Sequence, residues 1–369
     1  MMISSCPQDL LSPNIEAFFP DNDHALTGTT NNESLNNSAI LKDFQINIRK
    51  ISSKSTEMIF PSGMKIEFNV PMKRYTSFKI GGPADYFARP ASVEELLQLL
   101  RAARNNSIAS LVMGSGTNIL VKDNGIRGLV ISLVKMKNEI EIQDIDTDHV
   151  VLSASAGTIL AALCRKTIRD GLEDFSFAAG IPGTVGGAVM MNAGTGIGTI
   201  SDSLVSIDIL DTDNNIRRLD RSQLLFSHRK LDFISRPAIS SVNVRQKDSQ
   251  PVILKASFLL RKGNREKVEQ SWRTLIKKRK TTQPHGMPCA GCFFKNPDNG
   301  KSAGALIEMA GLKKRRVGDA MVSEKHANFI INLGNATAMD IITLKEIVKK
   351  TVFEKFSVKL SEEVIIQGE

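Results

Sequence analysis

A short segment at residues 290–297 places several reactive side chains close together. Its sequence is Ala-Gly-Cys-Phe-Phe-Lys-Asn-Pro, which contributes the thiol of Cys292, the ammonium of Lys295 and the amide of Asn296. A thiol can donate a proton to a substrate, and with an ordinary pKa near 8.5 it is mostly protonated at neutral pH. The segment therefore predicts a turn that holds and protonates a substrate.

Two glycine-rich segments lie upstream, at residues 114–118 and 180–187. Glycine lets the backbone approach a phosphate closely, and successive N–H groups can surround an anion. The first segment lacks the G-x-G-x-x-G spacing of a Rossmann dinucleotide site. Either loop alone could be a structural turn, but together they favour an anionic cofactor such as a flavin. The predicted cofactor-binding residues are Gly114, Ser115, Gly116, Thr117, Asn118, Gly180, Ile181, Pro182, Gly183, Thr184, Gly186 and Gly187.

Cys289 and Cys292 form a C-x-x-C pair, which leaves redox or metal chemistry as an alternative. The remaining cysteines, Cys6 and Cys164, do not form a second pair at zinc spacing. A thioredoxin-like motif would open a helix, whereas Phe-Phe-Lys-Asn-Pro follows here. We therefore predict no metal site.

Composition narrows the class of protein. The chain has 369 residues, of which 41% are hydrophobic, and a net charge of +9. No run of about 18 apolar residues occurs, so we expect no membrane insertion. We recognise no secretory signal and no disulfide framework, which favours a cytoplasmic location. One Trp and two Tyr offer little stacking surface, so we expect no nucleic-acid partner. Short basic clusters at residues 277–280 and 313–316 suit solvated helix ends or a rim that attracts a phosphorylated substrate.

The hydrophobic pattern predicts an extension followed by mixed α and β structure. Residues 1–60 are polar and aperiodic, which predicts a disordered extension, with order beginning near Met64. Helices are predicted from a capping box at residues 92–95, at residues 158–170, from residue 265 through 276, at residues 304–310 and from residue 337. Strands are predicted at residues 110–113, 128–133, 204–210, 216–219, 251–260 and 363–366, with a largely antiparallel sheet after residue 194.

Several of these segments, taken in order, resemble the UDP-N-acetylenolpyruvoylglucosamine reductase family, also called UDP-N-acetylmuramate dehydrogenases. The matching segments are residues 75–85, 114–120, 180–194, 290–297 and 326–330, and the resemblance covers about residues 65–369. It implies an α+β fold with a two-lobed FAD-binding domain of the PCMH type, as in vanillyl-alcohol-oxidase-like proteins. That domain would span residues 65–263, with lobes at about 65–134 and 135–263. A smaller α/β substrate-binding domain would span residues 264–369, its last strand returning toward the FAD domain.

The resemblance also implies a reaction. NADPH would reduce UDP-N-acetylglucosamine enolpyruvate to UDP-N-acetylmuramate through FAD, in cytosolic peptidoglycan precursor synthesis. Hydride would reach C3 of the enolpyruvyl group and a proton would reach C2. NADPH and the enolpyruvyl sugar would be the only partners implied.

The resemblance carries over to individual residues. Cys292 stands where the family usually has a serine proton donor, and Arg229 matches an arginine that follows a tyrosine. Here His228 replaces that tyrosine and Leu231 a nearby serine. Glu363 matches the second catalytic carboxylate.

Two residues of the 290–297 segment are expected at the substrate. Asn296 matches a contact to the substrate diphosphate, and Lys295 lies beside it. The chain has only Tyr75 and Tyr86, so it resembles the shorter subtype that lacks a tyrosine-bearing loop over the substrate.

Two other functions stay open at this point. One is an FAD oxidase or dehydrogenase of the same superfamily with another substrate, although the Phe-Phe-Lys-Asn-Pro turn argues against it. The other is a basic, non-catalytic nucleic-acid-binding protein, which a flavin absorbance spectrum of the purified chain would exclude.

Overall fold

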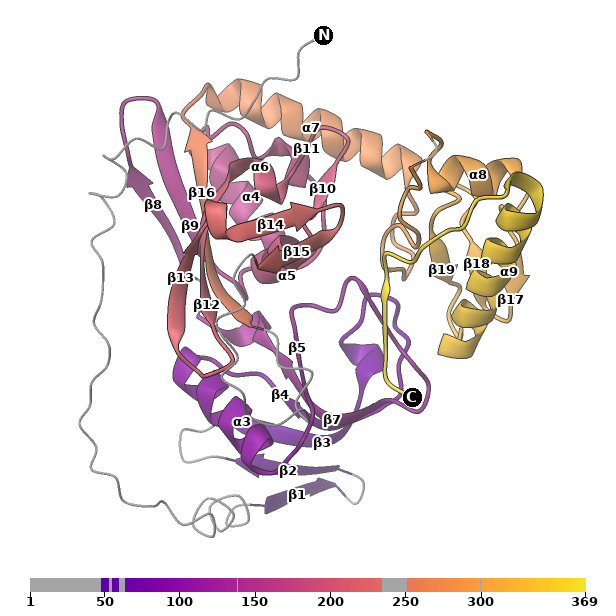
Figure 1. Ribbon diagram of the computed structural model, residues 1–369, viewed down its shortest axis with the longest axis horizontal. Coiled ribbons are helices and arrows are strands. Elements are labelled where there is room, and N and C mark those ends of the chain that lie inside the picture. The colour runs from indigo at the N-terminus through magenta and orange to yellow at the C-terminus, as the bar shows by residue number, and fades with distance from the viewer. Residues whose placement is uncertain (1–47, 53–54, 60–63, 138, 234–250, 299) are drawn as a thin grey trace.

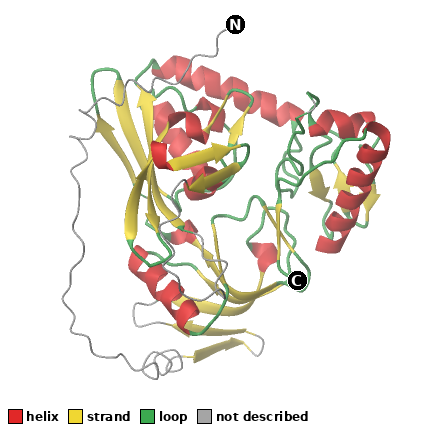
Figure 2. Cartoon of the chain, viewed as in Figure 1, coloured by secondary structure: helices red, strands yellow, loops and turns green. Residues whose placement is uncertain are grey.

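The structure is a computed structural model that describes residues 48–52, 55–59, 64–137, 139–233, 251–298 and 300–369. Two sheets with their helices are followed by a smaller C-terminal unit (Figures 1 and 2). Short 3-10 helices lie between the main elements at Met72–Arg74, Leu133–Lys135, Ser176–Ala178 and Arg221–Gln223.

The first sheet has the strand order β1-β2-β3-β4-β7-β5. Its strands are β1 (Ile48–Ser52), β2 (Ser55–Ile59), β3 (Lys65–Pro71), β4 (Pro83–Ala88), β7 (Ile126–Ser132) and β5 (Ser110–Met113). β7 pairs in parallel with β4 and β5, and the other pairs are antiparallel. A parallel pair needs a crossover connection, and α3 (Val93–Asn105) lies between β4 and β5 along the chain.

The helix predicted from the capping box is present, but the box is not reciprocal. The Ser92 hydroxyl accepts the N–H of Glu95 at 3.3 Å and so caps α3. The Glu95 carboxylate accepts the N–H of Ala91 at 2.6 Å instead of that of Ser92.

Regular structure begins earlier than the predicted start near Met64. β1 and β2 lie within residues 1–60, and β2 pairs antiparallel with β3. The predicted disordered extension is therefore wrong for these two strands. Serine and lysine interrupt the apolar residues there, so the sequence carries no sustained alternation. Residues 1–47 of the predicted extension lie outside the described residues.

The second sheet confirms the predicted antiparallel half of the chain. Its order is β13-β12-β16-β9-β8, and every pair in it is antiparallel. The strands are β8 (Ile140–Asp144), β9 (His149–Ser155), β12 (Leu204–Leu210), β13 (Ile216–Asp220) and β16 (Val252–Arg261). Two small hairpins accompany it, β10 (Gly194–Thr195) with β11 (Gly198–Thr199), and β14 (Leu224–Ser227) with β15 (Lys230–Phe233).

One continuous core joins the two sheets. It holds Ile131 of the first sheet, Leu152 and Phe258 of the second, and the thiol of Cys164, which is 2% exposed. The helices of this half are α4 (Leu160–Arg169), α5 (Val185–Met190), α6 (Ile200–Ser203) and α7 (Arg265–Thr282).

The long helix α7 packs on the second sheet's side of the molecule. Val268 and Trp272 of α7 belong to the core shared by the two sheets. α7 then runs along the edge of the molecule to the C-terminal unit (Figure 1). The substrate-binding domain was predicted to begin at residue 264. α7, the first helix after that boundary, packs mainly against the FAD-binding domain.

The C-terminal unit packs two helices on a small sheet. Its elements are α8 (Ala303–Met309), β17 (Arg316–Val317), β18 (Ala320–Val322), β19 (Ile330–Asn332) and α9 (Ala338–Phe356). α9 begins at Thr337, which forms a reciprocal capping box with Asp340. Its buried side includes Leu344 and Val348 and also the charged Lys345, whereas Ile347 is only partly buried.

The end of the chain returns to the first sheet's side. β20 (Ile365–Gln367) pairs in parallel with β6 (Ile119–Val121). The core of the C-terminal unit also includes Phe78, Ile80 and Leu120 from the first part of the chain. In the described part of the chain, no helix is long and apolar enough to cross a membrane.

Candidate active site

The predicted turn at residues 290–297 is fixed from both sides by backbone pairing. Asn328, which is 3% exposed, accepts the N–H of Phe293 at its carbonyl and that of Phe294 at its amide oxygen, at 2.7 and 2.9 Å. Its amide donates back to the Phe294 carbonyl at 2.8 Å. Both phenylalanine rings are buried, so they anchor the turn and do not face a substrate. The turn is therefore a rigid support for Cys292 and Lys295.

The segment that carries Glu363 pairs with this turn. The N–H of Lys295 donates to the Ser361 carbonyl and that of Glu363 to the Phe293 carbonyl, each at 2.8 Å. Phe294 and Glu362 face each other in an antiparallel bridge. Since alternate residues of an extended chain point to opposite faces, Glu363 and Lys295 share one face and Glu362 points to the other.

Arg229 reaches this site from a different domain. It lies in the two-residue turn between β14 and β15 and has a φ of 60°. Its guanidinium donates to the carbonyls of Asn192 at 3.4 Å and Gly194 at 3.1 Å, just after the second glycine-rich segment. Its Nε lies 2.8 Å from Oε1 of Glu363, and the two side chains are 21% and 16% exposed. The ion pair therefore joins the two halves of the molecule.

The three predicted catalytic residues thus converge, and each affects the ionisation of another. Burial raises the pKa of the Cys292 thiol to about 12, and the Glu363 carboxylate adds to the rise, while Arg229 and Arg279 oppose it. The thiol is therefore protonated at neutral pH. Burial also raises the pKa of Glu363, and Arg229 and Lys295 offset only part of that shift.

Arg279 is a site residue that sequence analysis missed. It belongs to the basic cluster at residues 277–280, which was interpreted as a solvated helix end or a rim. In the structure it is partly buried, and burial lowers its pKa, with Cys292 opposing and Arg229 reinforcing the shift. It lies beside Gly180, where a Cβ atom would come within 3.2 Å of its Nε. Arg279 lies three residues after Ile276 and seven after Trp272, so helical spacing places it on the side of α7 that faces the core. This signal was available in the sequence and separates Arg279 from its exposed neighbours.

The two glycine-rich segments lie against each other. A Cβ atom on Gly114 would lie 2.2 Å from Oγ1 of Thr184, and one on Gly183, whose φ is +121°, would lie 3.0 Å from Oγ1 of Thr117. Thr184 also caps α5 by accepting the N–H of Gly187 at 3.4 Å. The predicted cofactor segments therefore form one surface.

A cavity of about 260 Å³ adjoins this surface. Its lining includes Gly114 and Ser115 together with the cations Arg74 and Lys79. The Oγ of Ser115 is buried and has no hydrogen-bond partner among the described residues. The other lining residues are Tyr75, Thr76, Ser77, Ser132 and Val134. An unused hydroxyl, close backbone approach and two cations suit the phosphates of a dinucleotide such as FAD.

Residues 74–79 are further candidates for cofactor binding, which the sequence analysis did not name among the cofactor-binding residues. Their signal was available, because residues 75–85 were among the segments that carried the family resemblance.

Asn118, which was predicted at the cofactor, also holds the segment that carries Glu363. Its amide donates to the Glu363 carbonyl at 3.0 Å, and its own carbonyl accepts the N–H of Ile365 at 3.0 Å. Asn118 thereby connects the first glycine-rich loop directly to Glu363.

The predicted substrate residues lie in one part of the turn. The Asn296 side-chain oxygen accepts the N–H of Ala303 at 3.0 Å at the start of α8, which leaves its NH₂ group as the end that can donate to a ligand. His228, next to Arg229, has its pKa lowered by burial and by Arg229 and Lys295, with Asp298 opposing. His228 and Lys295 therefore lie close enough to interact electrostatically.

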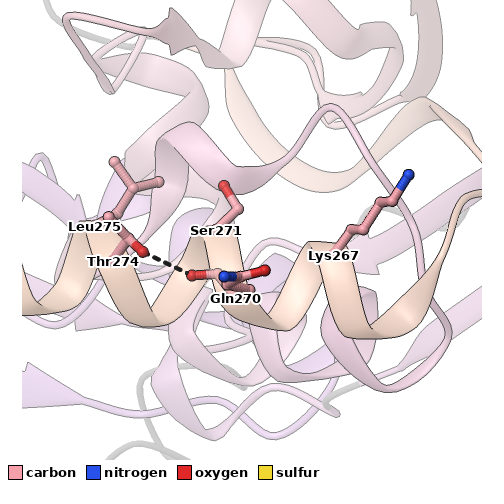
Figure 3. Close-up of a pocket in the computed structure, with 5 residues that line it drawn as sticks. All are labelled: Lys267, Gln270, Ser271, Thr274 and Leu275. Atoms are coloured by element: carbon pink, nitrogen blue, oxygen red, sulfur yellow. Dashed lines mark hydrogen bonds between the residues drawn. The ribbon is translucent and has the colours of Figure 1, made fainter.

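One further hollow contains none of the predicted site residues. A hollow of about 380 Å³ follows one face of α7 and is lined by Lys267, Gln270, Ser271, Thr274 and Leu275 (Figure 3). Among the described residues, His, Cys, Asp and Glu side chains do not form any group of three or more that could hold a metal ion. Cys164, Cys289 and Cys292 are free thiols.

Comparison with known proteins identifies a family for this chain. The family model described as "UDP-N-acetylenolpyruvoylglucosamine reductase, C-terminal domain" matches residues 283–367, and an FAD binding domain model matches residues 84–220. The UDP-N-acetylenolpyruvoylglucosamine reductase of Desulfosudis oleivorans is 40% identical over 83% of this chain and 95% of its own length. That of Clostridioides difficile is 38% identical over 89% of this chain and 99% of its own. This chain belongs to the UDP-N-acetylenolpyruvoylglucosamine reductase family.

A solved structure of the same family has the same fold. The crystal structure of UDP-N-acetylenolpyruvylglucosamine reductase from Thermus caldophilus superimposes with a TM-score of 0.66 at 32% identity, covering 83% of this chain and all of that one. As a member of the reductase family with an FAD-binding domain, the chain is an FAD-binding oxidoreductase, and the expected α+β fold is confirmed. The alternative of a non-catalytic nucleic-acid-binding protein is thereby set aside.

Proposed function

We propose that this protein reduces UDP-N-acetylglucosamine enolpyruvate to UDP-N-acetylmuramate with electrons from NADPH. The observation that carries the proposal is the convergence of Arg229, Glu363 and Cys292 from three distant segments. A buried neutral thiol, a cation and a carboxylate meet beside a glycine-rich surface. This set suits a reaction in which an enol-like anion forms and is then protonated.

The cofactor would lie on the glycine-rich surface. Gly114, Ser115, Gly183 and Thr184 would hold the FAD diphosphate, with Arg74 and Lys79 as nearby cations. When bound, FAD carries a hydride from NADPH to C3 of the enolpyruvyl group.

Arg229 would stabilise the negative charge that develops on the enolpyruvyl carboxylate and enol. Its guanidinium is preorganised by two backbone carbonyls and by Glu363, so it needs little reorientation during the reaction. Glu363 would keep this guanidinium in place and contribute to the hydrogen-bonded set. Arg279 adds a second cation that faces the same thiol.

Cys292 would then deliver the proton to C2. The S–H bond breaks, a C–H bond forms at C2, and a thiolate is left behind. Arg229 and Arg279 stabilise that thiolate, as their opposition to the raised pKa of Cys292 indicates. Solvent restores the proton to the thiolate after product leaves.

The sugar nucleotide would lie along the turn that follows Cys292. Lys295 and the NH₂ group of Asn296 would bind its diphosphate, since a cation and an amide donor suit phosphate oxygens. The reaction would supply a peptidoglycan precursor in the cytoplasm.

The test measures NADPH oxidation by the purified flavoprotein with and without the enolpyruvyl sugar. We expect rapid consumption of NADPH only when the sugar is present, with UDP-N-acetylmuramate as the product. Reoxidation of the NADPH-reduced flavin by the sugar, followed at the flavin absorbance, separates the two half-reactions. A flavoprotein that oxidises NADPH equally fast without the sugar, and yields no UDP-N-acetylmuramate, would exclude this function.

A further inference from the structure

One ion cluster beside the active site has no part in the proposed chemistry. The Glu362 carboxylate accepts a hydrogen bond from Lys349 at 2.8 Å and lies 3.3 Å from the ammonium of Lys345. Lys345 lies on the buried side of α9 and its side chain is only 11% exposed. A lysine so placed loses hydration, so its burial needs a compensating partner.

The two lysines are arranged to hold one carboxylate. They lie four residues apart on α9 and therefore project from adjacent turns on one side of the helix. Lys345 also contacts Glu346 at 2.8 Å, so its ammonium joins two carboxylates. Burial opposes the ionisation of Glu362, but the hydrogen bonds from Lys349 and Lys345 outweigh it and lower its pKa. Glu362 is therefore charged and held at neutral pH.

Glu362 lies in the same extended segment as Glu363, the carboxylate that the proposed function places at the reaction. It precedes Glu363, and the extended segment places the two side chains on opposite faces. Glu363 contacts Arg229 on one face, while Glu362 contacts α9 on the other. Rotation or translation of this segment would move both side chains together.

The helix that provides the lysines is itself tied to the cofactor half. Asp123, in the loop after β6, accepts the N–H groups of Ala338 and Met339 at 2.8 and 3.0 Å at the start of α9. The lysines thus link the catalytic segment to a helix that is fixed relative to the first glycine-rich loop.

We infer that Glu362, held by Lys345 and Lys349, is a positioning residue that sets the placement of Glu363 against Arg229 and Cys292. The inference rests on the proposed function for its kinetic consequence, but the placement itself can be measured without turnover. Glu362 makes no contact with substrate in this assignment and acts only through the segment it shares with Glu363.

The experiment uses Glu362→Gln in the full-length flavoprotein, with Lys349→Met as a second variant that removes the same contact from the helix. Glu354→Gln is the matched control, because Glu354 pairs with Lys350 on the exposed side of α9 at 3.8 Å. The first measurement is the rate of Cys292 alkylation by iodoacetamide at pH 8.5, followed on the Cys292 peptide by mass spectrometry. Burial raises the pKa of the Cys292 thiol and the Glu363 carboxylate adds to the rise, so loosening Glu363 should raise the alkylation rate several-fold in both variants and not in the control.

The second measurement compares the half-reactions. We expect Glu362→Gln to slow flavin reoxidation by the enolpyruvyl sugar about tenfold, while flavin reduction by NADPH changes less than about twofold. In a Glu363→Gln background the same change should have little further effect, because a residue that acts through Glu363 is not additive with it.

The outcomes distinguish this inference from the proposed function. If wild-type enzyme does not convert the sugar, the proposed function fails while the alkylation result still tests the placement. Unchanged Cys292 alkylation in both variants would overturn the positioning role. So would equal slowing of both half-reactions, or full additivity with Glu363→Gln, because either result indicates general destabilisation.

Discussion

Arg229 has an uncommon backbone conformation and lies at the centre of the candidate active site. A φ of 60° is costly for a side chain with a Cβ atom, on the order of 1 kcal/mol, yet a two-residue hairpin turn needs such a residue. Asparagine or glycine would satisfy the turn more easily. The arginine is held there by the carbonyls of Asn192 and Gly194 and by Glu363. The local backbone strain therefore places a guanidinium where the proposed reaction would need a cation.

Substitution of Arg229 should affect one half-reaction. We expect Arg229→Ala to leave flavin reduction by NADPH within about threefold of wild type. Flavin reoxidation by the enolpyruvyl sugar should slow about a hundredfold or more, which is the scale for losing one preorganised donor. Stopped-flow absorbance of the flavin measures both rates. Equal slowing of the two rates would remove Arg229 from charge stabilisation.

Cys292 tests the proton-donor assignment. Cys292→Ser should keep substantial turnover, since a hydroxyl is also a proton donor, whereas Cys292→Ala should reduce the flavin normally and fail to convert the sugar. The nearby Cys289→Ser is the control and should behave as wild type in the absence of oxidant. Full turnover by Cys292→Ala would exclude the thiol as donor.

The raised pKa of Cys292 gives a pH dependence with a definite sign. An ordinary thiol ionises near pH 8.5, whereas this one stays protonated up to about pH 12. We therefore expect wild-type reoxidation rates to show no loss from thiol ionisation between pH 7 and about pH 10.

Because the folded state holds the proton of Cys292 more tightly than the unfolded state, the raised pKa of this thiol makes unfolding easier as pH rises above about 8.5. Cys292→Ser should show a smaller loss of stability over that range, measured by urea unfolding at pH 8 and pH 10.

At the scale of elements, α9 is the helix that connects the two halves. Its first backbone N–H groups donate to Asp123, which lies in the opposite half of the molecule, in addition to its own capping box at Thr337 and Asp340. A carboxylate at a helix N-terminus gains from both hydrogen bonding and the helix dipole. α9 in turn carries the lysines that hold Glu362.

Removal of the Asp123 carboxylate should weaken the attachment of α9 to the loop after β6 without unfolding the protein. We expect Asp123→Ala to cost about 1 kcal/mol, the usual scale for losing a helix cap, and to lower the thermal midpoint by about 2 °C. Asp123→Asn should cost less, since its amide oxygen can still accept one N–H. Calorimetry of the flavoprotein compares the three proteins, and an unchanged midpoint in Asp123→Ala would contradict the role of this contact.

At the scale of the whole molecule, the active site exists only where distant parts of the chain meet. The last residues close it: Ile365 donates to the Asn118 carbonyl, and Gln367 and Glu369 accept the N–H groups of Lys122 and Asn124. Glu363 lies two residues before this parallel pairing of β20 with β6. The chain end thus sets how far Glu363 can move.

A truncation tests this closure. Deletion of residues 365–369 removes β20 but keeps Glu363, and we expect flavin reoxidation by the sugar to slow at least about tenfold with FAD still bound. Deletion of residues 368–369 alone keeps the paired strand and should have a much smaller effect. Stopped-flow rates and flavin content of the two truncated proteins give the comparison. Wild-type reoxidation after the longer deletion would show that the pairing does not control Glu363.

The sequence by itself determined what depends on local spacing. Hydrophobic alternation predicted β12 and β16, capping chemistry predicted α3 and α9, and the order of the motifs identified the family. Residue type alone showed that Cys292 could donate a proton. These features are local because a few neighbouring residues decide propensity, capping and motif.

Only the tertiary structure decided what depends on burial and on distant partners. Helical spacing places Arg279 and Lys345 on the core-facing sides of α7 and α9, but it does not identify their partners. The structure shows that Arg279 interacts with the Cys292 thiol and that Lys345 holds Glu362. β1 and β2 lack a clear pattern and are defined by pairing with β3. The pKa of Cys292 rises because folding buries the thiol and brings the Glu363 carboxylate near it. Burial and charge proximity arise between separate segments that fold together, so the spacing of residues along the chain does not show which charges become partners.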